Sequence, residues 1–297
     1  MEQGIAGKRR RWSGLRYRAE YIGLRLVAFI LRLMSLDMAS GFMGWIWRMI
    51  APWLHRHERV LTHLAKAYPE EPAAFHQKIA AEMWTNLGRV FAESLMIERI
   101  VRLGRIEDRT GTLVSTLQAS GKGTVFVSLH SGNWELAISP ALASGMKVAG
   151  VYQRIKNPLV DAWILAGRRE RYPRGLFAKG ADVGRRLMRV VREGGAVAIL
   201  ADLRDRRGIS VPFFGRPAPS SVFPALLSRS GDATLVAARV IRTHGVHFAI
   251  EAETIPVPQT EDRDADIVEA TTAIQALFEK WIREHPEQWM WGHRRWG

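Results

Sequence analysis

The chain of 297 residues contains no cysteine. This absence excludes disulfide bonds, thiol nucleophiles and cysteine-ligated metal sites. The chain also lacks a Gly-x-Ser-x-Gly nucleophile elbow, which disfavours a serine hydrolase. The glycines around Lys122 do not form a complete phosphate-binding loop. His55, His57 and His63 lack the spacing of zinc ligands on a helix,. The sequence therefore predicts no metal site.

Long uncharged apolar runs are also missing, although a helix that spans a bilayer needs about 20 such residues. The run Tyr21–Met34 is interrupted by Arg25 and Arg32, and a second run covers Met38–Leu54. We interpret the two runs as amphipathic helices that lie in the membrane interface, with arginines reaching lipid phosphates. A single span and core helices of a soluble bundle are the alternatives. No signal-peptide cleavage site follows the apolar region.

The charge balance is strongly positive, with a formal net charge of +14 and eleven tryptophans. Such a charge predicts an acidic partner, which would be anionic lipid, an acidic protein or nucleic acid. Tryptophan favours membrane interfaces because its ring is apolar and its N–H is polar. We expect three parts: a basic tail at 1–20, which includes Lys8–Arg11, a helical N-terminal segment at 21–110 and an α/β core at 111–297.

Short apolar runs alternate with helix-like segments after about residue 110. The predicted strands are Thr124–Leu129, Lys147–Tyr152, Ala196–Ala201, Leu235–Ile241 and His247–Ala252. The predicted helices are Trp134–Ser144, Leu159–Tyr172, Val183–Glu193, Val222–Arg229 and Ala265–His285. This alternation predicts an α/β fold, in which helices flank a mainly parallel sheet.

The first of these strands ends in a group of residues suited to acid–base chemistry. It leads into His130, a glycine-containing turn and Glu135. An imidazole at the carboxyl end of a strand becomes a general base when a carboxylate fixes its tautomer. Ser131 or Asn133 would cap a following helix, and the N–H groups of residues 131–134 would help to hold an oxyanion. A structural histidine with an unrelated surface glutamate is the alternative.

Four blocks of the sequence agree with one family in order and spacing. His130-Ser-Gly-Asn-Trp-Glu135 resembles the His-x4-acid motif of the glycerolipid acyltransferases. Its full sequence most resembles the motif of the lipid A late acyltransferases, the lauroyl and myristoyl transferase family. The further blocks are Val151-Tyr-Gln-Arg-Ile-Lys-Asn-Pro158, Ala201-Asp-Leu-Arg with Gly208-Ile-Ser-Val-Pro-Phe-Phe-Gly-Arg-Pro217, and His285-Pro-Glu-Gln-Trp-Met-Trp-Gly-His-Arg-Arg-Trp296. The resemblance extends from about residue 20 onward.

The resemblance implies roles for individual residues. His130 would be the general base and Glu135 the acid that orients it. Arg154 would meet charge near the thioester or a phosphate of the acceptor, and Asp202 would lie near the same pocket. Leu203 replaces the glutamine that usually follows this aspartate.

Two asparagines in these blocks, Asn133 and Asn157, are further candidates for substrate binding. Phe213 and Phe214 would be either a wall for an acyl chain or a buried loop anchor. The C-terminal tryptophans would lie either at the membrane interface or under the core.

As a function, the resemblance implies acyl transfer from a thioester, carried by acyl carrier protein or coenzyme A, to a hydroxyl of a lipid A precursor at the cytoplasmic face of the inner membrane. No cofactor is expected, because the thioester is already activated. Arginines at 168–174 and 185–192 would steer an acidic carrier or a phosphorylated lipid to the site. The alternative acceptors are a lysophospholipid, an aminolipid or a phosphoinositol mannoside. A non-catalytic protein that binds anionic membrane or nucleic acid is the alternative from another class, and no nucleic acid is expected.

Overall fold

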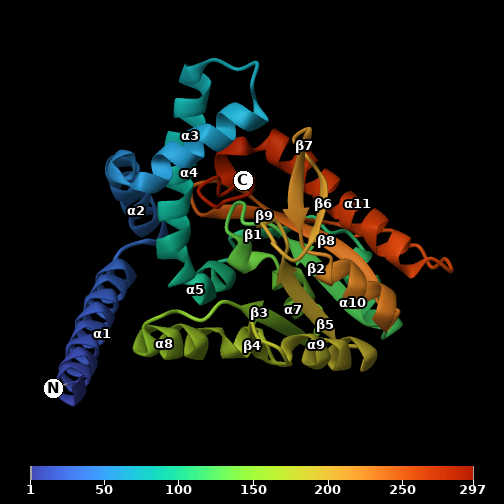
Figure 1. Cartoon of the computed structure of the whole chain (residues 1–297), viewed down its shortest axis with the longest axis horizontal. Helices are drawn as coiled ribbons and strands as arrows, with labels where there is room; N and C mark the ends of the chain where they lie inside the picture. The colour runs from blue at the N-terminus through green and yellow to red at the C-terminus, as the bar shows by residue number, and fades with distance from the viewer. Residues whose placement is uncertain (1, 297) are drawn as a thin grey trace.

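The computed structural model describes residues 2–296, and the side chains of residues 14–296. A seven-stranded sheet forms its centre, in the order β1-β9-β8-β2-β5-β3-β4 (Figure 1). Neighbouring strands are parallel except for the antiparallel pair β8–β9. The strands are β1 (Ile106–Asp108), β2 (Thr124–Ser128), β3 (Val148–Tyr152), β4 (Leu176–Ala178), β5 (Ala196–Leu200), β8 (Thr234–His244) and β9 (His247–Ile255).

Helices cover both faces of this sheet, so its central strands are apolar on both sides. All five residues of β2 are buried. Val125 and Val127 belong to one apolar core and Phe126 to another, because successive side chains of a strand point to opposite faces,. The helices of the α/β part are α6 (Leu113–Ser120), α7 (Ser139–Ala143), α8 (Pro158–Arg168), α9 (Val183–Arg192), α10 (Phe223–Gly231) and α11 (Arg263–Glu284).

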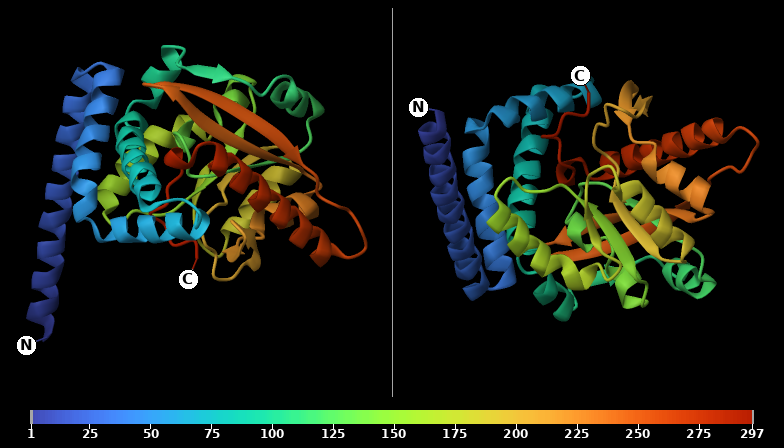
Figure 2. Two further views of the ribbon diagram at one scale, coloured as in Figure 1. Left: turned by 90° about the horizontal axis from the view of Figure 1, so that it is seen from above. Right: turned by 60° about the horizontal axis from the view of Figure 1, so that its bottom comes forward.

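Five helices precede the sheet and form a separate layer at its flank. They are α1 (Glu2–Leu33), α2 (Leu36–Ile50), α3 (His55–Ala67), α4 (Ala73–Ser94) and α5 (Ile97–Arg102). Helices α1 and α2 lie side by side along one flank (Figure 2). In the described part of the chain, no helix combines the length and the apolarity that crossing a bilayer requires.

The outer surface of α1 and α2 is rich in exposed apolar side chains. Trp53, which follows α2 directly, is 88% exposed. The other exposed large apolar side chains here include Ile22, Leu26, Phe29, Ile30, Leu33, Met38, Phe42, Trp45, Met49 and Ile50. We call this surface the apolar face of α1–α2. The side chains of the basic run Lys8–Arg11 lie outside the described ones.

The predicted fold class is confirmed, with a mainly parallel sheet flanked by helices. The prediction of one helix over Trp134–Ser144 is wrong, because a 3-10 turn (η2, Trp134–Leu136) is followed by the short α7. Pro140 in the first turn of α7 explains the break, since proline has no N–H to continue the helical hydrogen bonds,. The antiparallel hairpin of β6 (Ile209–Phe213) and β7 (Arg216–Ser220) was not predicted.

The proposed division at residues 20 and 110 stays a prediction. Residue 20 lies inside α1, which is continuous from Glu2 to Leu33.

Candidate active site

The site begins where two neighbouring parallel strands end. Strands β2 and β5 pair with Ser128 opposite Leu200. His130 and Asp202 each follow their paired residue by two positions, so the sheet brings them together. Side chains that follow adjacent strands meet at the carboxyl edge of a parallel sheet, where α/β proteins gather their binding groups.

The contact between His130 and Asp202 is direct. Nδ1 of His130 lies 2.8 Å from Oδ1 of Asp202. The other oxygen, Oδ2, accepts the backbone N–H of His130 at 2.9 Å and the indole N–H of Trp289 at 2.8 Å. One carboxylate therefore holds both the ring and the backbone of His130.

Asp202 is completely buried. Burial alone would raise its pKa, but the charge of His130 and the hydrogen bonds from His130 and Trp289 outweigh burial and lower its pKa to about 2. An ionised carboxylate can only accept hydrogen bonds. In the neutral His130 ring, Nδ1 must therefore carry the hydrogen, which leaves Nε2 as the proton acceptor.

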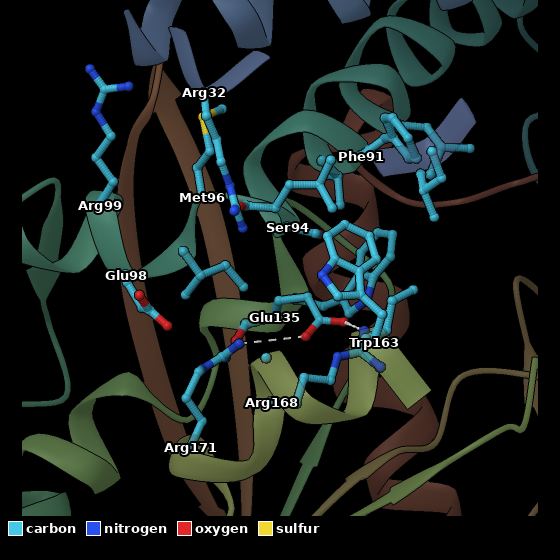
Figure 3. Close-up of a pocket in the computed structure, with 18 of the residues that line it drawn as sticks. Arg32, Phe91, Ser94, Met96, Glu98, Arg99, Glu135, Trp163, Arg168 and Arg171 are labelled. Atoms are coloured by element: carbon cyan, nitrogen blue, oxygen red, sulfur yellow. Dashed lines mark hydrogen bonds and ion pairs between the residues drawn. The ribbon is translucent and has the colours of Figure 1, made fainter. Parts of the chain in front are cut away.

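Glu135 lies elsewhere in the site. Its carboxylate bonds to Arg168, and its Oε2 lies 3.7 Å from Nη1 of Arg171. Figure 3 shows Glu135 between these two arginines of α8 and the turn after it. The expected contact of Glu135 with the His130 ring is therefore absent from the described residues, and Asp202 takes that place. The reason is local, because the 3-10 turn at Trp134–Leu136 directs Glu135 toward α8 whereas His130 faces β5.

His130 and Glu135 nevertheless open onto one cavity of about 1100 Å³. The apolar part of its wall comes from α1, α2, α4, α8 and the link between α4 and α5, and includes Leu24, Trp47, Leu87, Val90, Phe91, Met96 and Trp163. Its cationic part consists of Arg32, Arg99, Arg102, Arg168 and Arg171. Figure 3 shows Arg168 and Arg171 beside the Glu135 carboxylate, whereas Arg32 and Arg99 lie farther from it. The cavity thus combines a surface for a hydrocarbon chain with groups that attract anions.

The other predicted substrate contacts lie away from this cavity wall. Arg154 is exposed in the loop after β3 and does not line the cavity. Asn157 is buried at the N-cap of α8, where its side chain accepts the N–H groups of Leu159 and Val160. Its amide group donates to the Tyr17 carbonyl at 2.9 Å and to Glu20 at 3.0 Å. The structure therefore uses Asn157 as a helix cap and as a link to α1.

Asn133 is fully buried in the turn after His130. It occupies the N-cap position of η2, but its side chain makes no capping bond and donates instead to Glu93 at 3.0 Å. The N–H groups of Ser131 and Gly132 already donate to the carbonyls of Leu129 and Gln288. These two groups are therefore not free to hold an oxyanion in this conformation.

The aromatic residues of the last two blocks belong to the core. Phe213 and Trp291 are fully buried, and Phe214 and Trp289 are nearly so. Phe213 and Trp289 pack at a centroid distance of 5.8 Å. The anchor interpretation of the phenylalanines therefore holds, and neither residue lines the cavity. The C-terminal aromatic residues pack under the site rather than at the surface.

Sequence reasoning missed the roles of Trp289, Arg168 and Arg171. Trp289 belongs to a block that resembles the family, but only the fold places its indole against Asp202. The two arginines were noticed as part of a charge cluster, and only the fold places them beside Glu135. Among the side chains of residues 14–296, no three His, Asp or Glu residues are arranged to hold a metal ion.

Comparison with known proteins identifies the family of the chain. The model of the bacterial lipid A biosynthesis acyltransferase family matches residues 5–297. A lipid A biosynthesis palmitoleoyltransferase of Escherichia coli K12 is 24% identical over 259 residues, which cover 83% of this chain and 81% of the relative. A phosphatidylinositol mannoside acyltransferase of Mycobacterium tuberculosis H37Rv is 26% identical over 252 residues, covering 78% and 74%. The chain belongs to the bacterial lipid A biosynthesis acyltransferase family.

Proposed function

We propose that this acyltransferase moves a fatty acyl group from a thioester, carried by acyl carrier protein or coenzyme A, to a hydroxyl of a lipid A precursor, with His130 as the general base. The observation that carries the proposal is the bond of 2.8 Å between His130 Nδ1 and a buried Asp202 carboxylate. The base lies at the wall of a cavity large enough for a hydrocarbon chain.

In the proposed step, Nε2 of His130 takes the proton of the acceptor hydroxyl. The oxygen attacks the thioester carbonyl, a C–O bond forms, and the C–S bond breaks as the tetrahedral intermediate collapses. The imidazolium returns its proton to the departing thiolate, so that the product thiol and the ester leave a neutral ring. Asp202 stabilises the imidazolium in between. General-base catalysis of this kind typically contributes about 10²–10⁴-fold, and positioning supplies much of the rest.

In this proposal Glu135 orients two arginines and does not orient His130. Its carboxylate holds Arg168 and Arg171 at the cavity wall, where guanidinium groups would meet the negative charge of a substrate,. The ion pairs fix two long side chains that would otherwise be mobile. Arg154 stays a candidate for contacts with the part of a substrate that extends beyond the cavity.

Only the relatives indicate which lipid is the acceptor. One relative is named for lipid A biosynthesis and another for a phosphatidylinositol mannoside. We favour a lipid A precursor because the matching family model is that of lipid A biosynthesis. The mannoside is the second candidate.

We further propose that the protein acts at the cytoplasmic face of the inner membrane. The apolar face of α1–α2 would enter the interface of the bilayer, and the positive net charge would hold the protein to anionic lipid,. Leu24 and Arg32 of α1 and Trp47 of α2 also line the cavity. A lipid acceptor would therefore have a short path from the bilayer to His130.

Mass spectrometry of total lipid and lipid A from a strain that lacks this chain tests the proposal. We expect one lipid species to lose one acyl group in this strain. Expression of the wild-type protein should restore the acylated lipid, whereas expression of His130→Ala should not. His55→Ala, an exposed histidine on α3, is the matched control and should restore the species fully. Full restoration by His130→Ala would overturn the assignment of the base, and a changed mannoside with unchanged lipid A would favour the second acceptor.

A further inference from the structure

A buried ion pair lies behind the turn that carries His130. The carboxylate of Glu93, on α4, is completely buried and accepts four hydrogen bonds. Oε1 accepts from Ser40 Oγ at 2.6 Å and from Arg242 Nη1 at 2.6 Å. Oε2 accepts from Arg242 Nη2 at 2.9 Å and from Asn133 Nδ2 at 3.0 Å. The carboxylate is thus fully satisfied, and one of its four donors belongs to the turn.

A second side chain of α4 forms hydrogen bonds to the same turn. Nδ2 of Asn86 lies 3.2 Å from the carbonyl oxygen of Gly132 and 3.2 Å from that of Gln288. Its Oδ1 accepts Nε of Arg242 at 2.9 Å. The Gln288 carbonyl also accepts the Gly132 N–H at 3.2 Å. Arg242 therefore connects both α4 side chains, and each of these holds one residue of the turn.

Burying a carboxylate and a guanidinium is costly unless both are fully hydrogen-bonded. An apolar pair of similar volume would often stabilise a core equally well, so stability alone does not explain this ion pair. Neither Glu93 nor Arg242 takes part in the proton transfer proposed above. Glu93 bonds directly to Asn133, and Arg242 bonds to Glu93 and to Asn86, which contact the turn at Asn133 and at Gly132. Hydrogen bonds fix the orientation of the groups that they join more strictly than apolar packing does.

From this arrangement we infer that Glu93, Arg242 and Asn86 are positioning residues for acyl transfer. They hold the turn at Gly132 and Asn133 so that the His130 ring faces the cavity, and they act through the turn without touching substrate. The expected effect of these residues on turnover rests on the proposed function. Their expected effect on the order of the turn does not, and it can be measured independently.

Strand β8 offers a matched control in Arg239. This arginine also bonds to two carboxylates, those of Glu251 and Glu284, and its guanidinium lies over the Trp281 ring at 5.2 Å. It makes no bond to the turn in the described part of the chain. Replacing Arg239 or Arg242 by lysine removes a guanidinium from the same strand while keeping its charge.

The experiment compares Arg242→Lys with Arg239→Lys in the full-length protein. Amide hydrogen exchange is measured over peptides that cover residues 130–135 and over the sheet strands, and kcat and KM for an acyl thioester are measured with each variant that folds. Arg242→Lys should raise exchange in the turn at least tenfold, while β2 and β5 stay protected. It should lower kcat by about 100-fold, as expected for a misplaced catalytic group, with KM within threefold. Arg239→Lys should change neither the turn nor kcat.

Asn86→Asp provides a second variant of nearly the same shape. It keeps the acceptor for Arg242 but loses both donors to the carbonyls, so it should also loosen the turn and lower kcat. Turn exchange that matches Arg239→Lys in both variants would overturn the inference, as would exchange that rises over the whole sheet. If the wild type transfers no acyl group from any thioester, the proposed function fails, while the exchange data still decide whether the network holds the turn.

Discussion

Asp202 contacts His130 at two points, with Oδ1 at 2.8 Å from Nδ1 of the ring and Oδ2 at 2.9 Å from the backbone nitrogen. The ring and the main chain of the proposed base are thus fixed by one buried carboxylate.

The first prediction concerns Asp202→Asn. The amide would present an N–H group to one of the three donors that now surround the carboxylate, and it would carry no charge to stabilise an imidazolium. We expect kcat to fall by about 10²–10⁴-fold, as for other histidine bases that lose their carboxylate. Steady-state acyl transfer measures it. Asp205→Asn, on the loop after Asp202, is the control and should stay within threefold of the wild type. Equal kcat values for the two variants would contradict this role.

The second prediction concerns the pairing of Glu135. Glu135→Gln and Arg168→Gln each remove one partner of an ion pair that is mostly buried. A double-mutant cycle on the free energy of unfolding should give a coupling of about 1 kcal/mol for this pair. The cycle of Glu135→Gln with Asp202→Asn should give a coupling near zero, because no hydrogen bond joins these residues in the described chain. Urea unfolding measures both cycles. Coupling of Glu135 to Asp202 that is as strong as its coupling to Arg168 would contradict the separation of the two acids.

Particular residues show what the sequence could and could not predict. The five predicted strands exist because runs such as Val125–Val127 are apolar on both faces, and this pattern is local. Strands β1 and β4 have three residues each, too few for a periodic pattern. The hairpin of β6 and β7 contains prolines that disfavour a strand in any local prediction.

The site shows the same division between local and long-range information. His130 was found because it ends an apolar run and belongs to a recognisable block. Its partner was assigned to Glu135, five residues away, because that acid is near in sequence. The partner in the structure, Asp202, is 72 residues away, and only the pairing of β2 with β5 brings it near. Strand order is a property of the whole sheet, so no local pattern contained it.

The third prediction compares two glycines with the same backbone conformation. Gly132 has φ of +57° and Gly104 has φ of +64°. A Cβ at Gly132 would lie 2.1 Å from the carbonyl oxygen of Val240, whereas a Cβ at Gly104 would meet nothing within 4 Å. Gly104→Ala should therefore cost only the strain of the left-handed region, on the order of 1 kcal/mol. Gly132→Ala should cost clearly more and displace the turn.

Thermal unfolding and acyl-transfer assays check this comparison. Gly104→Ala should keep full turnover, and Gly132→Ala should lose at least 100-fold in kcat if it folds, since a shift of about 1 Å is enough for such a loss. Similar stability and turnover in both variants would mean that the turn tolerates a side chain, contrary to the close approach of the β8 backbone.

The fourth prediction tests the apolar face of α1–α2. Trp53 is 88% exposed in this face. A tryptophan side chain partly immersed in a bilayer interface contributes on the order of 1–3 kcal/mol, so Trp53→Ser should weaken binding to anionic vesicles by tenfold or more. Vesicle co-sedimentation measures it. Val268→Ser, at an exposed apolar position of α11 away from this face, is the control and should bind as the wild type does. Unchanged binding by Trp53→Ser would exclude this part of the face from the contact.

The last prediction concerns His293, whose ring centroid lies 5.9 Å from that of His130. Burial and then the nearby charge of His130 lower the pKa of His293 from 6.5 to about 4. Between pH 6.5 and 4 the unfolded chain therefore binds a proton at this residue that the folded chain does not. The free energy of unfolding should fall as the pH falls through this window.

His293→Gln removes this proton uptake, so its stability should depend less on pH than that of the wild type. Urea unfolding at pH 7 and pH 4.5 measures the difference, which we expect to be on the order of 2 kcal/mol smaller in the variant, allowing for the partial exposure of the ring. His55→Gln, at an exposed position, controls for the loss of a histidine as such. If the wild type and His293→Gln lose the same stability between the two pH values, the pKa of His293 is not lowered in the folded protein.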